Sequence, residues 1–314
     1  MTTDTRNVPI LVGPTAVGKT SVSIHLARLL NAEIISADSR QVYIGLDIGT
    51  AKPSLEERRG IPHHLIDVVG IDREFTVSDF QRLAFEALEG IYGRGKSALV
   101  VGGTGLYVRA LVDNPSFQDL PPVPEIRRAI LDEISEMGPE AVYAELVRLD
   151  PDAAHRIHPN NIPRLVRAVE VIRATGKRFS DGVKKDASRE SKSPWRWEII
   201  GLTMDRPALY DRINARVLEM LKNGWLDEVR RVLASGATGD EKPLQGLGYR
   251  DLVAHLKGNQ SLDKSIELIQ RDTRRFAKRQ MTWFRMLDGI QWVQLGPHDS
   301  PAQVAESILT LVES

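Results

Sequence analysis

The chain of 314 residues contains no cysteine, so it has no disulfide bond, no thiolate zinc site and no cysteine nucleophile. It has no apolar run near the roughly 18 residues that a membrane-spanning helix requires, and residues 1–7 are polar, without the apolar centre of a secretory signal. Basic and acidic residues number 42 each, so there is no overall excess of charge to attract a polyanion. These absences favour a soluble cytoplasmic protein in which any nucleic-acid surface is local.

A glycine-rich segment at residues 13–20 is the most informative feature that the sequence does contain. It reads Gly-Pro-Thr-Ala-Val-Gly-Lys-Thr and fits the phosphate-binding pattern G-x-x-x-x-G-K-[ST]. The apolar run at 8–12 predicts a buried strand before it, and apolar residues at helical spacing in 19–30 predict a helix after it. The N–H groups of such a loop and the positive end of the helix dipole converge on an anion. The predicted pyrophosphate-binding residues are Gly13, Pro14, Thr15, Ala16, Val17, Gly18, Lys19 and Thr20.

Two residues of this loop have side chains with predicted roles of their own. Lys19 supplies a full positive charge to the outer phosphate, and the Thr20 hydroxyl is the predicted ligand of a Mg²⁺ cofactor. The pattern indicates a pyrophosphate group without specifying a nucleotide. An ATPase or GTPase usually also has a Walker-B Asp that supports Mg²⁺, whereas the predicted strand at 97–101 is followed by Gly102 and Gly103. This difference weakens nucleotide hydrolysis as an interpretation.

Asp38 follows the second predicted strand along the chain, at residues 33–36. In doubly wound sheets ligands collect at the carboxyl ends of the strands, so Asp38 is expected near the phosphate-binding loop. A carboxylate in that place can bind Mg²⁺ through water or accept a proton from a substrate. From its spacing alone, a structural role as a helix cap or turn residue is an equally good interpretation.

The strongest nucleic-acid signal lies in residues 270–285. If the segment is helical, at about 100° per residue, six cations fall on one stripe, and only Asp272 opposes them in charge. A solvated helix face usually alternates the sign of its charges, so this stripe favours binding to an RNA backbone, with salt dependence but without sequence reading. The cations are Arg271, Arg274, Arg275, Lys278, Arg279 and Arg285, and the aromatic and apolar residues off the stripe, predicted to pack inward, are Phe276, Met281, Trp283 and Phe284.

The middle of the chain has a different character from its two ends. Residues 115–124 are rich in proline and predict a linker. Residues 179–193 are charged, serine-rich and poor in apolar residues, which predicts a mobile loop. Apolar periodicity predicts helices between these segments, at 126–137, 139–149 and 163–175. An all-helical insertion is therefore expected.

After the insertion the α/β pattern returns. A strand is predicted at 197–202 and a long helix at 209–225, and residues 291–314 predict a further strand and a closing helix. The predicted fold is α/β, with a P-loop NTPase-like parallel sheet flanked by helices and an inserted all-helical domain. The predicted boundaries are 1–115 and 196–314 for the two parts of the catalytic core and 116–195 for the insertion.

Eight segments of the chain resemble the tRNA dimethylallyltransferase family, also called tRNA isopentenyltransferases. They are GPTAVGKT, ISADSRQVY, DIGTAKP, PHHLID and VVGGTGLY, followed by RLVRAVEV, LQGLGYR and RRFAKRQMTWFR, and they extend over residues 11–285. Many enzymes share the first of these, whereas D-S-x-Q-V-Y and R-R-x-A-K-R-Q-x-T-W-F-R are far more specific. The resemblance implies transfer of a dimethylallyl group from dimethylallyl pyrophosphate to N6 of adenosine 37, beside the anticodon of tRNA.

The resemblance also implies roles for individual residues. The arginine that matches Arg216 reaches the pyrophosphate in the family, although this sequence alone would place Arg216 at the surface. Lys19, Arg216 and Mg²⁺ would stabilise the negative charge of the leaving pyrophosphate, and Asp38 would take the proton of the weakly nucleophilic amine. The target base must leave its stack to reach the donor. The helical insertion resembles the part that the family uses to grip the anticodon arm.

A set of residues is predicted to contact this tRNA, most of them because they lie in the matching segments. Arg127 matches more loosely than the others, and for Arg164 and Arg167, three apart on one helix face, a solvated face is an equally good interpretation. The predicted tRNA-binding residues are Asp38, Ser39, Arg40, Gln41, Thr104, Arg127, Arg164, Arg167, Gln245, Gly246, Leu247, Gly248, Tyr249, Arg250, Lys278, Arg279, Gln280, Thr282, Trp283 and Arg285.

Three other functions remain as alternatives. A P-loop kinase that phosphorylates a small molecule with ATP would explain residues 13–20 but would leave the basic stripe without a role. A non-catalytic RNA-binding protein with a nucleotide switch would leave Asp38 without one. An enzyme that prenylates free adenine nucleotides would need neither the stripe nor the insertion. The expected partners are the anticodon arm of tRNA and dimethylallyl pyrophosphate, with no membrane, and the expected state is a monomer.

Overall fold

The computed structural model describes residues 6–114, 123–183, 194–296 and 298–312. The chain divides into two compact units, the first made of Met1–Val112 with Ser193–Ser314 and the second of Asp113–Lys192. In the part of the chain that the structure describes, every helix is too short or too polar to cross a lipid bilayer.

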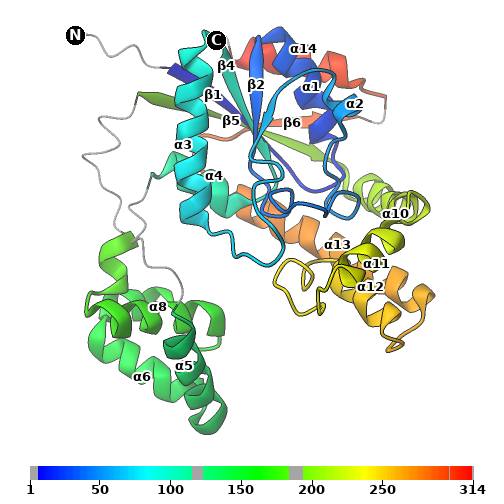
Figure 1. The fold of residues 1–314 in the computed structure, drawn as a ribbon. Helices are drawn as coiled ribbons and strands as arrows, with labels where there is room; N and C mark the ends of the chain where they lie inside the picture. The colour runs from blue at the N-terminus through cyan, green and yellow to red at the C-terminus, as the bar shows by residue number, and fades with distance from the viewer. Residues whose placement is uncertain (1–5, 115–122, 184–193, 297, 313–314) are drawn as a thin grey trace. The chain divides into compact units, whose positions relative to one another are not determined.

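A parallel sheet of six strands forms the centre of the first unit (Figure 1). Its strands are β1 (Arg6–Val12), β2 (Ala32–Ser36), β3 (His63–His64), β4 (Ser97–Gly102), β5 (Trp195–Met204) and β6 (Gln291–Leu295). They lie in the order β3-β2-β4-β1-β5-β6, and every neighbouring pair is parallel. In the central register Ile10 lies opposite Val100 on one side and Ile199 on the other. Such near-continuous apolar runs are typical of parallel strands buried on both faces.

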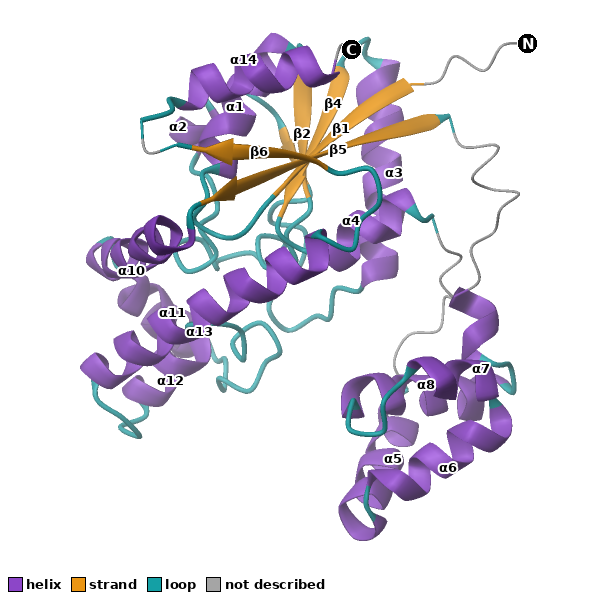
Figure 2. Cartoon of the chain, turned by 180° about the vertical axis from the view of Figure 1, so that it is seen from behind, coloured by secondary structure: helices purple, strands orange, loops and turns teal. Residues whose placement is uncertain are grey.

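Helices cover both faces of this sheet. The helices of this unit are α1 (Lys19–Leu29), α2 (Leu55–Arg58), α3 (Val77–Gly93), α4 (Gly105–Val112), α10 (Arg206–Lys222), α11 (Trp225–Ala234), α12 (Tyr249–Leu256), α13 (Leu262–Phe284) and α14 (Pro301–Val312). Ile10 and Ile35 face a core that includes Phe80 of α3, whereas Leu11 and Ile34 face α1 and α14 on the other side. Figure 2 shows α13 running below the sheet from α12 towards α4.

The second unit is a small helical domain with its own core. Its helices are α5 (Pro124–Met137), α6 (Pro139–Leu149), α7 (Pro151–Arg156) and α8 (Ile162–Thr175), followed by the 3₁₀-helix η1 (Phe179–Val183). A proline stands in the first turn of each α-helix, where the missing N–H would have no partner anyway. Ile130, Leu146 and Leu165 meet in the core, and Gly176 ends α8 in the left-handed conformation.

The predicted fold class is confirmed, and the final strand and helix are present as β6 and α14. Two element boundaries were wrong. The helix predicted over 209–225 ends at Lys222, because Gly224 takes a left-handed φ of 94° and Trp225 begins a separate helix. The strand predicted at 197–202 is longer, Trp195–Met204. Most of the predicted linker, 115–122, and of the predicted mobile loop, 184–193, lies outside the described residues.

Candidate active site

The phosphate-binding loop joins β1 to α1 as predicted. Gly13 passes so close to β5 that a Cβ atom would lie 2.7 Å from the Leu202 carbonyl oxygen, and Gly18 has a left-handed φ of 110°. The Lys19 ammonium group donates hydrogen bonds of 2.9 Å to the carbonyl oxygens of Gly13 and Pro14. Burial lowers the pKa of Lys19 to about 8; the Asp38 carboxylate opposes this effect and the Arg216 guanidinium adds to it. A partly desolvated cation therefore spans the loop.

Asp38 lies directly beyond the carboxyl end of β2, half-buried. Its Oδ1 accepts a hydrogen bond of 2.8 Å from the backbone N–H of Arg40, which holds the carboxylate in a tight turn. Asp38 is close enough to Lys19 and Arg216 to raise the pKa of each and to add to the raised pKa of Tyr107, which is due first to burial. Asp38, Lys19 and Arg216 thus belong to one site.

Thr104 connects the ends of β2 and β4. Its hydroxyl accepts a 3.0 Å hydrogen bond from the Ser39 N–H and lies 3.3 Å from the Ser39 hydroxyl. Its own N–H donates to the Ala37 carbonyl oxygen at 3.2 Å. At Gly102 a Cβ would lie 2.1 Å from that same carbonyl oxygen, so only glycine permits the two strand ends to approach. Ser39 and Thr104, both predicted site residues, are therefore brought together beside Asp38.

A polar pocket lies behind the loop. Its lining includes Lys19, Thr20, Asp38, Gln41 and His63. The Thr20 hydroxyl and the Asp38 carboxylate are oxygen ligands of the kind that Mg²⁺ prefers, so the donor set fits this ion. The Gln41 side chain forms hydrogen bonds within the protein. Its oxygen accepts a hydrogen bond from the Ser36 hydroxyl, and its amide nitrogen donates to the carbonyl oxygens of Thr50 and Ala51.

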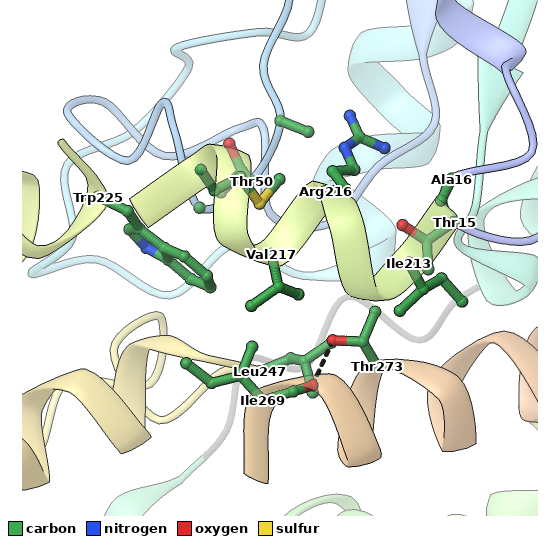
Figure 3. A pocket seen from close by; sticks show the side chains of 13 residues that line it. Thr15, Ala16, Thr50, Ile213, Arg216, Val217, Trp225, Leu247, Ile269 and Thr273 are labelled. Atoms are coloured by element: carbon green, nitrogen blue, oxygen red, sulfur yellow. Dashed lines mark hydrogen bonds between the residues drawn. The ribbon is translucent and has the colours of Figure 1, made fainter. Parts of the chain in front are cut away.

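A second, mainly apolar cavity also borders the loop. Thr15 and Ala16 of the loop line it together with Arg216, and Figure 3 shows Arg216 on α10 between Thr50 and Ala16. Burial lowers the pKa of Arg216, against the effect of nearby carboxylates, yet a guanidinium keeps its charge at neutral pH. The apolar lining comes from four parts of the chain and consists of Ile213, Val217, Met220, Trp225, Leu247 and Ile269.

Glu228 of α11 holds the loop that forms one wall of this cavity. Its carboxylate accepts hydrogen bonds from the N–H groups of Asp47 (2.8 Å), Ile48 (2.7 Å) and Gly49 (3.3 Å) and from the Tyr249 hydroxyl (2.6 Å). Burial and this carboxylate raise the pKa of Tyr249. Glu228 could not be predicted as a site residue, because a glutamate in the first turn of a helix is common at the surface.

Several predicted tRNA-binding residues of the segment 245–250 have contacts inside the protein. Tyr249 is 2% exposed, and Gly248 leaves room for Trp225, whose ring a Cβ would meet at 2.2 Å. Gln245 donates to the Gly239 carbonyl oxygen at 2.6 Å. Leu247 lines the apolar cavity. The structure therefore gives these side chains roles in building the cavity, while Gly246 packs beside Arg40.

The basic stripe lies on α13, and its N-terminal half is organised around Asp272. Arg271 (2.9 Å), Arg275 (3.5 Å) and Arg250 of α12 (2.7 Å) all form ion pairs with this one carboxylate. Hydrogen bonding from Arg271 is the main reason that the pKa of Asp272 is lowered. Arg250 also pairs with Asp251 at 3.6 Å, so three guanidinium groups meet two carboxylates and a small local excess of positive charge remains. Arg274 donates to the Asn214 side chain at 2.6 Å.

The C-terminal half of the stripe is more exposed. Lys278, Arg279, Thr282 and Arg285 have exposed side chains, as an RNA contact requires. Trp283 instead packs on Gly105, where a Cβ would meet its ring at 2.7 Å, and the Arg109 guanidinium lies 5.7 Å from the centre of a Trp283 ring. Gln280 is 6% exposed and faces the phosphate-binding loop. Gln280 is thus buried on the opposite face of α13 from the cations, and its side chain has partners inside the protein.

The remaining predicted residues belong to the helical unit. Arg127 and Arg167 each form a 2.9 Å ion pair with Glu170, whose side chain is fully buried. The Val123 N–H also donates to Glu170. Burial alone would raise the pKa of Glu170. The hydrogen bonds that it accepts, first of all from Arg167, outweigh this effect and lower its pKa. Both arginines therefore stabilise this unit, whereas Arg164 is exposed on α8.

The sequence is similar to known proteins over nearly its whole length. A family model described as IPP transferase matches residues 41–287. The chain belongs to the tRNA dimethylallyltransferase family. It is 44% identical to the tRNA dimethylallyltransferase of Acetivibrio thermocellus over 96% of both chains. It is 46% identical to tRNA dimethylallyltransferase 1 of Syntrophotalea carbinolica over 98% of this chain and 95% of that protein.

Solved structures of the family agree with this assignment. The tRNA isopentenylpyrophosphate transferase of Bacillus halodurans is 40% identical, with a TM-score of 0.71 over 98% of this chain and 97% of that one. A eukaryotic dimethylallyltransferase acting on tRNA is 30% identical, with a TM-score of 0.73 over 92% of this chain and 74% of that one. The family resemblance and the P-loop NTPase-like fold are thereby confirmed. The protein is a prenyl transferase of this family, and the kinase alternative is not favoured.

Proposed function

We propose that this protein transfers the dimethylallyl group of dimethylallyl pyrophosphate to N6 of adenosine 37 in the anticodon arm of tRNA, with release of pyrophosphate. One observation carries the proposal: the phosphate-binding loop and Arg216 border the same cavity as six apolar side chains. A ligand with a charged diphosphate head and a short branched hydrocarbon tail matches such a lining. We also propose that the enzyme acts in the cytoplasm as a monomer.

Each part of the site has a task in this reaction. The bond between the allylic carbon and the diphosphate oxygen breaks as N6 bonds to that carbon. Lys19, Arg216 and the N–H groups of the loop stabilise the charge that builds on the leaving diphosphate. The Asp38 carboxylate accepts the proton that N6 loses. The Thr20 hydroxyl would hold Mg²⁺, which supplies further positive charge to the diphosphate when bound.

A direct assay tests the proposal. Labelled dimethylallyl pyrophosphate is incubated with the enzyme and with unmodified tRNA, AMP or ATP as separate acceptors. We expect label on tRNA alone, and digestion of the product should yield N6-dimethylallyladenosine from position 37. Label on AMP or ATP would instead support prenylation of free nucleotides. If ATP is bound tightly and the prenyl compound is not, the proposed donor is wrong.

The pH dependence of donor binding is expected to follow Lys19. Burial lowers the pKa of Lys19 to about 8. The side chain is therefore positively charged below that pH and loses its charge above it. The dissociation constant for dimethylallyl pyrophosphate should therefore rise between pH 8 and 9.5, by up to about tenfold per unit. In Lys19→Arg the side chain stays charged over this range, so calorimetry should give a much flatter profile. Equal profiles in both proteins would exclude Lys19 as the titrating group.

The exposed end of the basic stripe is expected to bind the tRNA backbone. Lys278→Ala should weaken tRNA binding and reduce the slope of log K against log salt by about one unit. Lys264→Ala is the matched control, because Lys264 is an exposed lysine of the same helix that pairs with Glu267 at 2.8 Å. Filter binding at several salt concentrations measures both variants. An unchanged slope for Lys278→Ala would remove this residue from the RNA surface.

A further inference from the structure

Gln280 connects three parts of the first unit through one buried amide group. It lies on α13, about 180° around the helix from Arg271 at about 100° per residue, and it is 6% exposed. Its Oε1 accepts a 2.9 Å hydrogen bond from the backbone N–H of Thr15. Its Nε2 donates a 2.9 Å hydrogen bond to the carbonyl oxygen of Gly103. The phosphate-binding loop, the turn after β4 and the basic helix are thus joined at this side chain.

The contact restrains the loop next to a residue in an unusual backbone conformation. Ala16 has a left-handed φ of 65°, which is uncommon for a residue with a side chain and persists where the surroundings impose it. Within the loop, the Val17 N–H reaches the Pro14 carbonyl oxygen only at 3.4 Å. The N–H of Thr15 donates to Gln280 at 2.9 Å. Gln280 fixes the residue immediately before this strained position.

Few side chains could replace the amide. The site requires one acceptor towards Thr15 and one donor towards Gly103, and a glutamine side chain offers both from one planar group. An ionised glutamate has no donor, and a lysine has no acceptor. A side chain at Gly103 would displace this amide, because a Cβ there would lie 2.5 Å from Nε2 of Gln280. The pairing of Gln280 with Gly103 is therefore specific in both chemistry and shape.

We infer that Gln280 is a positioning residue: it holds the phosphate-binding loop in the conformation that receives a diphosphate, and it fixes that loop to the helix that carries the basic stripe. The inference rests on the proposed function in one respect, that a diphosphate group binds at the loop. This role requires no direct contact of Gln280 with the donor or with the RNA. Its effect on the reaction passes through the backbone of Thr15 and Ala16.

Inorganic pyrophosphate is the probe that tests this role, because it reports on the loop whatever the prenyl donor and acceptor are. In Gln280→Leu both hydrogen bonds are lost, and calorimetry should show a dissociation constant for pyrophosphate that is about tenfold higher. The dissociation constant for tRNA should change by less than about twofold, since the exposed cations remain. The matched control is Gln270→Leu, which removes a 3.1 Å hydrogen bond to the Asn214 carbonyl oxygen from the same helix and should leave pyrophosphate binding unchanged.

The variant Gln280→Glu distinguishes a hydrogen-bonding role of Gln280 from a role in packing alone. When ionised, the introduced carboxylate accepts from Thr15 but faces the Gly103 carbonyl oxygen without a proton between them. When protonated, it offers one acceptor and one donor, as the amide does. The pyrophosphate affinity of this variant relative to wild type should therefore recover as the pH falls from 8 to 6. This variant also serves if Gln280→Leu fails to fold.

Each outcome decides the inference. Pyrophosphate affinities of Gln280→Leu and Gln280→Glu that match the Gln270→Leu control, or a relative affinity of Gln280→Glu that does not depend on pH, would overturn it. Wild-type protein that binds no pyrophosphate would overturn it together with the proposed function. Wild-type protein that binds pyrophosphate but transfers no prenyl group would refute the proposed function alone, and the variants would still be judged by their pyrophosphate affinities.

Discussion

Replacing Asp38 by asparagine is expected to lower the rate of prenyl transfer by about 10²–10⁴-fold, the range for loss of a general base. The acceptor amine is a weak nucleophile because its lone pair is delocalised into the adenine ring. It gains reactivity if its proton passes to a carboxylate as the new bond forms. Asparagine keeps the oxygen that accepts the Arg40 N–H at 2.8 Å, so the turn should persist while the base is lost.

The measurement is a single-turnover rate with enzyme in excess over tRNA, which separates the chemical step from product release. Filter binding should show that Asp38→Asn binds tRNA about as well as wild type. Asp38→Ala is the companion variant, because it removes both the base and the turn hydrogen bond, and its additional loss measures the value of the turn. A turnover near that of wild type in Asp38→Asn would show that Asp38 is not the base.

The fold and the phosphate-binding loop could be predicted because their signals are local. The loop needs glycine at Gly13 and Gly18 for backbone reasons that any chain must satisfy, and an apolar strand and an amphipathic helix flank it. The position of Asp38 followed from one rule of parallel sheets, that ligands gather at the carboxyl ends of strands. The exception was Gly224, where a glycine inside an apparent helix was in fact its end.

The apolar cavity could not be predicted, because its lining is assembled from distant segments. Ile213, Val217 and Met220 recur at helical spacing and look like the core face of α10. Ile269 of α13 has the same appearance. Only the packing of α10 against α11 and α13 shows that these side chains border a space next to the phosphate-binding loop. The sequence records that a residue is apolar without recording whether it meets protein or ligand.

The internal hydrogen bonds of Gln280 could not be predicted from its sequence segment either. Gln280 was predicted to contact tRNA because it lies in RRFAKRQMTWFR, a segment that matches the family. Helical geometry alone already places it about 180° from Arg271 at about 100° per residue, on the side that must face the core. The angle could have separated Gln280 from the stripe, but its partners Thr15 and Gly103 lie 265 and 177 residues away in the chain.

Replacing Arg216 by methionine is expected to raise the dissociation constant for dimethylallyl pyrophosphate by about 30- to 1,000-fold, since loss of one partner of a buried charged pair costs about 2–4 kcal/mol. Methionine preserves much of the apolar stem beside Ile213 and Val217, so the cavity should keep its shape. The affinity for tRNA should not change, because the basic stripe lies on another helix.

Arg212→Met is the matched control for this variant. Arg212 lies one turn earlier on α10 with an exposed side chain, outside the lining of the cavity. It should therefore bind the donor with the affinity of wild type. Calorimetry with the donor and filter binding with tRNA measure both proteins. If Arg216→Met and Arg212→Met lose the same small amount of donor affinity, Arg216 acts as an ordinary surface charge, and the diphosphate must be held by the loop and Lys19 without it.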